Sequence, residues 1–297
     1  MASRQPTART PTVRMQKTKK PSPGARRGGE KRSSGGGGWG RWVLGGWLLF
    51  VLWLSVGYAR LPDVSGLRTE NPRTTALMEQ RSEEANEEGR KPRVRQAWVS
   101  LGAVAPHAVD AVLISEDARF YRHEGVDWKE VENSIDQSVR EARLGRGAST
   151  LTQQLAKNLY LSTDRSLLRK AKEFVLARRL EEHLSKQRIL ALYLNVVEWG
   201  PGVYGIEAAA REHFGTSARA LTVAQGAMLA AMLPAPRRWL PAQRPETLRT
   251  RAGVILTRLE REGRISAAQA REAQAELSRF FGVSPASEAI ARLPAES

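Results

Sequence analysis

One carboxylate, Glu116, lies on the apolar stripe of a predicted helix. Val112 and Leu113 belong to this stripe, and Phe120 and His123 continue it at helical spacing from Glu116. A carboxylate among apolar neighbours costs free energy unless it is paired or functional. The pattern therefore indicates either a salt-bridged helix end or an acid with a chemical task.

A second candidate is the string GASTLTQQLAKN over 147–158, a glycine-flanked loop that leads into a capped helix. Thr150 and Gln153 form a capping box, and Lys157 follows Gln153 by one turn on the same face. A helix N-terminus presents free amides and the positive end of the helix dipole, which suits a phosphate or a sugar. The simpler alternative is an ordinary capped helix with polar surface residues.

The third candidate combines cations with an acid. Arg169 and Lys170 precede Glu173 by one helical turn, at the start of a long helical region that runs through Leu194. Such residues often form solvated ion pairs of small energetic value. The alternative is an anion site with a carboxylate beside it.

These three groups lie in a region whose pattern is densely helical, and strand-like alternation is scarce. Capping boxes predict helix starts at Thr150, Thr222 and Ser266. A short helix is expected over 74–87 and a hairpin over 196–205. Further signals mark helix ends, namely Gly215, Pro234 and Gly263. We predict one mainly α-helical domain over 97–282, followed by a C-terminal tail over 283–297.

The N-terminal region has a different composition. The chain has 297 residues and a net charge of +16, and residues 1–34 contain ten Lys or Arg against one acid. An uncharged run over 42–59 follows, bracketed by Arg41 and Arg60. At about 1.5 Å per residue this run reaches roughly 27 Å, close to the thickness of a bilayer core. It predicts one transmembrane helix, with the basic flank on the cytoplasmic side.

Two alternatives exist for the run over 42–59, namely a cleaved signal peptide, since 57–59 has a small-x-small pattern, and a buried core helix. On the transmembrane interpretation, residues 1–41 form a disordered basic tail and residues 60–96 a polar stalk. The absence of cysteine excludes disulfides, thiolate metal sites and cysteine nucleophiles.

Five strings in the chain resemble the signature motifs of the bacterial peptidoglycan glycosyltransferases. They are Glu-Asp-x-x-Phe-x-x-His-x-Gly-x-Asp over 116–127, GASTLTQQLAKN over 147–158, RKAKE over 169–173 with LSKQRILALYLN over 184–195, VVEWGPGVYGIEAAAREHFG over 196–215 and AQGAMLAAMLPAPRRW over 224–239. LPDV at 61–64 and NPRTTALM at 71–78 resemble the monofunctional branch, the biosynthetic transglycosylases. That branch has no transpeptidase domain, and the chain contains no Ser-x-x-Lys.

The resemblance implies a lysozyme-like helical fold with a small mobile lobe over 126–147. It implies an enzyme that polymerises lipid II into β-1,4-linked glycan with inversion and releases polyprenyl pyrophosphate. Glu116 matches the family's general base and Glu173 its second essential acid. Substrate contacts are carried over to matching positions, which are Ser149, Thr150, Gln153, Gln154, Lys157, Asn158, Arg165, Arg169 and Lys170.

Some expectations stay open at this point. No cofactor is expected to bind tightly, but Glu173 could hold Mg²⁺ or Mn²⁺ against the pyrophosphate, orient the cations or assist the leaving group. Many members have a basic residue where this chain has Asn133, and Arg140 or Arg143 could substitute for it.

The expected location is the inner membrane, with a single span, the N-terminus in the cytoplasm and the catalytic domain in the periplasm. Expected partners are lipid II, the nascent glycan strand, membrane lipids and possible elongation or division proteins. Two other classes compete. A muramidase or lytic transglycosylase shares the broad fold but needs no cation cluster, and a basic membrane protein could use its N-terminal arm on nucleic acid. We expect no nucleic-acid partner, because the arm adjoins a predicted span.

Overall fold

A computed structural model describes residues 38–132, 149–164 and 166–282. The chain forms two compact units, with the boundary between Tyr58 and Ala59. Residues 133–148, which include most of the predicted mobile lobe with Asn133, Arg140 and Arg143, lie outside the described residues, as do Arg165 and both predicted tails apart from 38–41.

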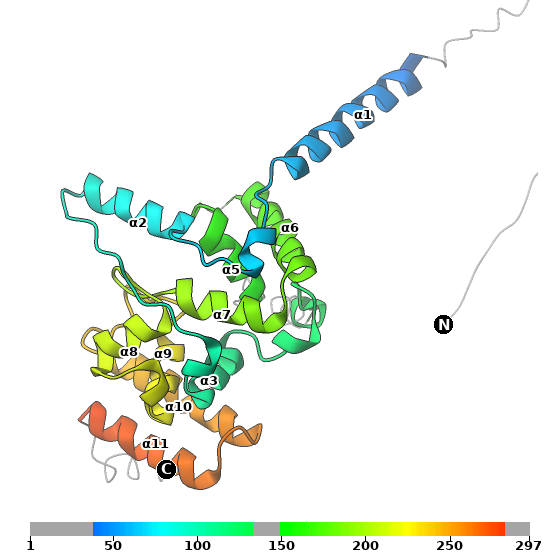
Figure 1. Ribbon diagram of the computed structural model, residues 1–297. Helices are drawn as coiled ribbons and strands as arrows, with labels where there is room; N and C mark the ends of the chain where they lie inside the picture. Colours follow the sequence, from blue (N-terminus) through cyan, green and yellow to red (C-terminus); the bar gives the residue numbers. More distant parts are fainter. Residues whose placement is uncertain (1–37, 133–148, 165, 283–297) are drawn as a thin grey trace, which may run out of the picture. The chain divides into compact units, whose positions relative to one another are not determined.

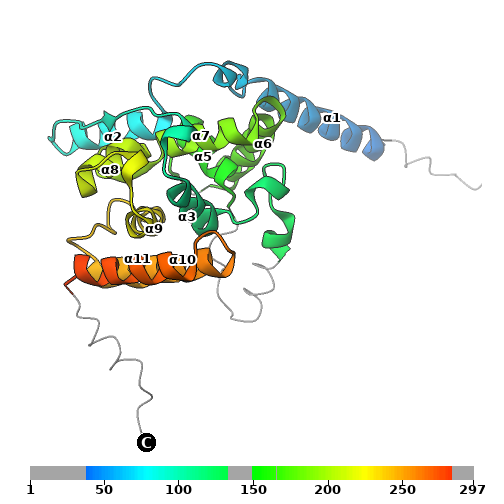
Figure 2. The ribbon, with the colours of Figure 1, turned by 60° about the horizontal axis from the view of Figure 1, so that its bottom comes forward.

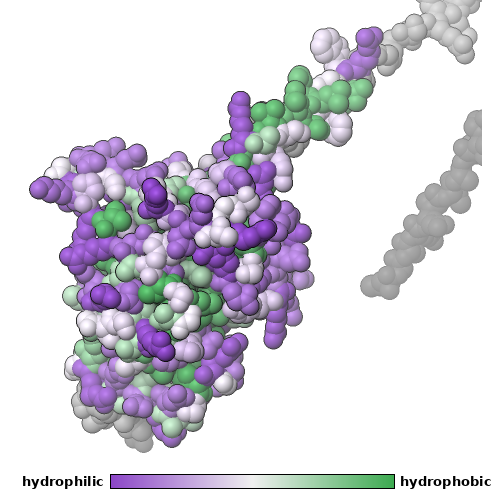
Figure 3. All heavy atoms as spheres, in the orientation of Figure 1, coloured by the Kyte–Doolittle hydropathy of each residue, from purple (hydrophilic) through white to green (hydrophobic). Residues whose placement is uncertain are grey.

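The first unit contains one described helix, α1 (Gly38–Ala59), which covers the predicted span over 42–59. Trp42, Trp47 and Leu49 are exposed on it, and hydrophobic residues gather along its length (Figure 3). Within the described residues, no helix has the length and apolar character needed to cross a membrane.

The second unit is built mainly from helices, as predicted (Figures 1 and 2). Its α-helices with full bounds are α2 (Ala76–Glu87), α3 (Pro106–Glu116), α5 (Leu151–Tyr160), α6 (Leu167–His183), α7 (Lys186–Val196), α8 (Ile206–Phe214), α9 (Val223–Met232), α10 (Pro245–Arg261) and α11 (Ala267–Phe280). The 3₁₀ turns are η1 (Ser65–Arg68), η2 (Leu101–Ala103), η3 (Phe120–Arg122) and η4 (Ala218–Ala220). The strands are β1 (Arg95–Gln96), β2 (Glu198–Gly200) and β3 (Val203–Tyr204).

Several helix ends are determined by residues close to them in the sequence. All three predicted capping boxes are present, at Thr150, Thr222 and Ser266. Gly215 ends α8 with a φ of 67°, a left-handed conformation that glycine adopts at little cost. These helix starts and this stop are confirmed, because each depends only on residues within one turn.

A three-stranded sheet in the order β1-β3-β2 contains the predicted hairpin. β2 and β3 pair antiparallel, and β1 pairs parallel with β3, which the sequence did not predict. The backbone before β1 lies close to the backbone of the hairpin, since a Cβ added to Gly202 would lie 2.4 Å from the carbonyl oxygen of Arg93. Gly202 therefore permits the contact that brings β1 onto the hairpin.

The segment over 60–96, which we expected to form a polar stalk, packs as part of the second unit. Val64 and Leu67 are buried in the main core, and Met78 of α2 is buried beside Tyr204. Arg81 of α2 also lies 3.3 Å from the buried carboxylate of Glu198. A few apolar residues and several long-range ion pairs thus hold a segment whose average composition is polar.

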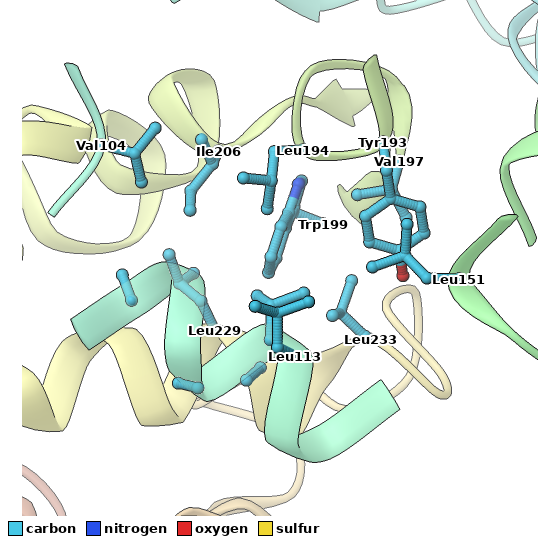
Figure 4. Packing of buried hydrophobic residues seen from close by; sticks show 14 of the residues in the cluster. Val104, Leu113, Leu151, Tyr193, Leu194, Val197, Trp199, Ile206, Leu229 and Leu233 are labelled. Carbon is cyan, nitrogen blue, oxygen red and sulfur yellow. The ribbon is translucent and has the colours of Figure 1, made fainter. Parts of the chain in front are cut away.

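The main core joins α3 and α9 to the strand and helix region around Trp199 (Figure 4). Trp199 has no exposed surface and lies among Leu113, Leu194 and Leu229. α9 packs against both α3 and α10, so these three helices form one scaffold. This scaffold determines where Glu116, the last residue of α3, is placed.

Candidate active site

Glu116 is held by a chain of three side chains from different helices. Gln154 of α5 donates from Nε2 to Glu116 Oε2 at 2.9 Å, and Ser115 Oγ donates to Glu116 Oε1 at 3.2 Å. The hydroxyl of Tyr193 in α7, which is fully buried, donates to Gln154 Oε1 at 3.0 Å. Because Tyr193 occupies the amide oxygen of Gln154, the amide nitrogen is turned toward the carboxylate.

The surroundings of Glu116 act on its pKa in opposite directions. Burial raises the pKa of Glu116, whereas the hydrogen bonds from Gln154 and Ser115 and the charges of Arg251 and Lys157 lower it. Burial is the largest of these effects, so the net pKa is raised. A carboxylate with a raised pKa is a stronger base than an exposed one.

Arg251 of α10 is a site residue that our sequence analysis missed. Its guanidinium lies 4.7 Å over the ring of Trp239, and burial lowers the pKa of Arg251 while Glu116 raises it. Within the described residues its buried Nε has no hydrogen-bond partner. A signal was present, since Arg251 falls on the stripe that Leu248 and Ile255 bury in α10.

Asp117, the residue after Glu116, ties this end of α3 to the start of α5. Its Oδ2 accepts from the backbone amide of Leu151 at 2.9 Å, and His123 Nε2 lies 3.0 Å from both of its carboxylate oxygens. Asp127 lies nearby and pairs with Arg119 at 3.3 Å. Asp117, His123 and Asp127 could geometrically hold a metal ion. Their existing bonds already give them a structural task, however.

Three predicted substrate contacts have buried side chains. Gln153 and Thr150 hold each other in the capping box, and Thr150 Oγ1 also donates to the carbonyl of Gly125 at 2.6 Å. Asn158 is 4% exposed, as is Gln153. Gln153 and Asn158 therefore position α5, whereas Thr150 also lines the cavity that contains Glu116. The side chains of Gln154 and Lys157 are half-buried and so remain partly open to a ligand.

The predicted cations surround Glu173 near the start of α6. Arg169 pairs with Glu173 Oε2 at 2.6 Å, and Lys170 pairs with Glu173 Oε1. Lys170 Nζ also donates to Ser149 Oγ at 2.9 Å. The pKa of Lys157 is lowered, first by burial and then by Arg169, Lys170 and Arg81, whereas Glu173 raises it. Lys157 therefore belongs electrostatically to this cluster.

Glu116 lines a cavity of about 180 Å³, and so does Ser149. Lys170 of the cation cluster donates a hydrogen bond to Ser149 but does not itself line the cavity. An acid therefore faces this space, and the cation cluster is joined to its wall through Ser149. This arrangement suits a reaction in which a proton is removed at one end while negative charge develops at the other.

Glu173 does not fit the role of a metal ligand as it stands. Both of its oxygens are engaged by cations and its side chain is 4% exposed, so a divalent ion would have to displace Arg169 or Lys170. We therefore derive no step through a metal at Glu173.

The sequence of the chain matches a known protein family. Residues 82–260 match the family described as Transglycosylase. A biosynthetic peptidoglycan transglycosylase from Nitrosomonas eutropha is 40% identical over 223 residues, which are 73% of this chain and 91% of that protein. One from Azoarcus sp. is 42% identical over 200 residues, or 67% and 85% of the two chains.

A solved structure also matches part of the chain. Penicillin-binding protein 1A from Haemophilus influenzae matches 61% of this chain with 17% of its own, at 23% identity and a TM-score of 0.36. The family match covers α3, the capped helix α5, the cation-bearing helix α6 and most of α10, and so contains every residue that lines the cavity with Glu116. The chain belongs to the transglycosylase family.

Proposed function

We propose that this chain is a peptidoglycan glycosyltransferase that joins lipid II into β-1,4-linked glycan strands for cell wall synthesis. The family and the names of its relatives support a peptidoglycan transglycosylase activity. The observation that carries the mechanism is the cavity shared by Glu116 and Ser149, with Lys170 bonded to Ser149. The absence of a Ser-x-x-Lys string supports an enzyme without transpeptidase activity.

In the proposed reaction the sugar 4-hydroxyl of one lipid II molecule attacks the anomeric carbon of the donor strand. An alcohol is far too weak an acid to be ionised in advance, so Glu116 accepts the proton while the new C–O bond forms. The bond from the anomeric carbon to the pyrophosphate breaks in the same displacement. One displacement inverts the configuration at that carbon and needs no covalent intermediate.

The leaving polyprenyl pyrophosphate carries its electron pair into the positive cluster. Lys157, Arg169 and Lys170 are fixed before the reaction begins, so their charges need not reorganise as negative charge develops. In this scheme Glu173 positions Arg169 and Lys170 and moderates the repulsion between them.

We also propose that α1 anchors the enzyme in the inner membrane, with the basic N-terminus in the cytoplasm and the catalytic unit in the periplasm. The uncharged run over 42–59 and the cationic residues before it support this orientation. An exposed apolar group on the second unit is consistent with work at a lipid surface; it consists of Trp128, Leu167, Leu168 and Phe174. The proposed substrate is itself anchored in a membrane by its lipid, so the enzyme has to work at the membrane surface.

The decisive experiment replaces Glu116 by Gln, which keeps the shape of the side chain but removes its basicity. Purified Glu116→Gln protein should melt like the unaltered protein yet polymerise lipid II about a hundredfold to ten-thousandfold more slowly. Strand formation at a near-normal rate would remove Glu116 from the role of base. Clearing of cell-wall sacculi by the unaltered protein, without strand synthesis, would favour a muramidase or lytic transglycosylase.

A further inference from the structure

Arg258 of α10 separates two hollows in the catalytic unit. On one side it lines the cavity that contains Glu116. On the other it lines a groove of about 540 Å³ between α10 and α11, which pack side by side (Figure 2). A ligand that extends beyond the catalytic cavity past Arg258 would therefore enter this groove.

The groove is positively charged. Its lining consists of Arg249, Thr250, Gly253, Val254, Thr257, Arg258, Arg261, Gln274, Leu277 and Ser278. Three of these side chains are cationic and none is acidic. Arg249 is paired with Glu246 at 3.0 Å, but in the described part of the chain neither Arg258 nor Arg261 has an acidic partner. The groove therefore suits a ligand that carries carboxylates.

Gly253 gives the groove its depth. A glycine inside a helix costs about 1 kcal/mol relative to alanine, so it usually has a packing reason. Gly226 of α9 has one, because a Cβ there would lie 2.8 Å from the backbone of Ala108. Gly253 has none, since a Cβ added to it would meet no atom within 4 Å. The absence of a side chain at Gly253 therefore leaves the space between α10 and α11 open.

We propose that the groove between α10 and α11 binds the growing glycan strand, through the carboxylates of its peptide side chains, as the strand leaves the catalytic cavity. The proposal rests on the proposed role of Glu116, because that residue defines where the strand begins. Arg258 and Arg261 bind the carboxylates, and Val254 offers an apolar surface to the sugar rings. α10 and α11 lie at the end of the unit opposite α2 and α6 (Figures 1 and 2), so this path leads away from the lipid-binding cations.

Binding of soluble strands tests the carboxylate contact. Glycan oligosaccharides that retain their peptides are titrated against the full-length protein in detergent and compared with the same oligosaccharides after amidase has removed the peptides. We expect Arg261→Glu to weaken binding of the peptide-bearing strands about tenfold, the value of one charge-assisted hydrogen bond. The control, Arg271→Glu, changes an exposed arginine of α11 outside the groove and should bind normally. Equal binding of strands with and without peptides would overturn the proposal.

Strand length tests the path itself. Gly253→Trp should fill the groove and shorten the strands made from lipid II, as resolved by gel electrophoresis. Glu260→Trp, which places the same side chain on an exposed position of α10 outside the groove, should give strands of normal length. If the folded Gly253→Trp protein makes strands of normal length, the groove does not carry the growing strand. If Gly253→Trp melts early, the strand-binding measurement on Arg261→Glu decides whether the groove binds the strand. Polymerisation by Glu116→Gln would instead reject the proposed catalytic site.

Discussion

At the scale of single residues, Glu116 has to be buried enough to be a strong base and yet ionised when the substrate arrives. Burial raises its pKa and Arg251 lowers it. Together with the hydrogen bonds from Gln154 and Ser115, which also lower the pKa of Glu116, these effects set the pH at which the base becomes active. Arg251 thus tunes the base from α10, a helix distant from α3 in sequence.

Replacing Arg251 by Ala should move the acidic limb of the pH profile to higher pH. Without this positive charge the pKa of Glu116 rises further, so a higher pH is needed to ionise the base. The measurement is kcat/KM for strand formation as a function of pH. Arg219→Ala, which removes an exposed arginine on η4, should leave the limb in place. A shift to lower pH would contradict this role for Arg251.

The basic limb of the pH profile of kcat/KM should depend on Glu173. This carboxylate raises the pKa of Lys157, which burial and the neighbouring cations lower. In Glu173→Gln the pKa of Lys157 falls further, so Lys157 loses its proton, and activity declines, at a lower pH than in the unaltered enzyme. Glu182→Gln on the same helix is the matched control, because Glu182 is exposed and pairs with Arg178. An unchanged basic limb would separate Glu173 from the cation cluster.

The sequence singled out the acid and the cations as candidate site residues but not how they are held. Glu116 was singled out because an acid on an apolar stripe is unusual, and the motif resemblance supplied the other candidates. Gln154 was predicted to contact substrate, and in the structure its amide binds Glu116. Arg251 was missed because the stripe in α10 shows only that this side chain faces inward, whereas its relation to Glu116 depends on how α10 packs against α3.

At the scale of elements, the contact of α3 with α9 depends on Gly226. We expect Gly226→Ala to destabilise the protein by about 1–3 kcal/mol, because its methyl group would press on the backbone of Ala108. Gly253→Ala is the matched helix control and should be neutral or stabilising by up to about 1 kcal/mol. Urea unfolding followed by circular dichroism measures both. Equal stability of the two variants would show that α9 can move away from α3 without cost.

Elements with local signals were predictable, and those that depend on distant partners were not. The capping boxes and the turn at Gly202 each depend on residues that are close together in the sequence. The parallel pairing of β1 with β3 and the burial of Val64 and Leu67 require contacts across the chain. Their segment is polar on average, so composition alone suggested a free stalk.

At the scale of the whole molecule, the proposed catalytic side chains Glu116 and Glu173 lie in the unit that begins at Ala59. Deleting residues 2–34 should therefore leave polymerisation of lipid II intact, although it removes ten cationic residues. Strand synthesis per molecule of membrane-bound protein is the measurement, with Glu116→Gln as the inactive reference. Loss of activity would assign the basic arm a direct task and reopen the nucleic-acid interpretation.

The packing of Val64 limits how far the catalytic unit can travel from α1. Four residues, 60–63, separate the end of α1 from this buried side chain, and four extended residues reach at most about 14 Å. A free stalk over 60–96 would have reached roughly ten times as far as this short tether. With α1 held in a bilayer, as proposed, the first buried residue of the catalytic unit stays within this reach of the membrane surface throughout synthesis.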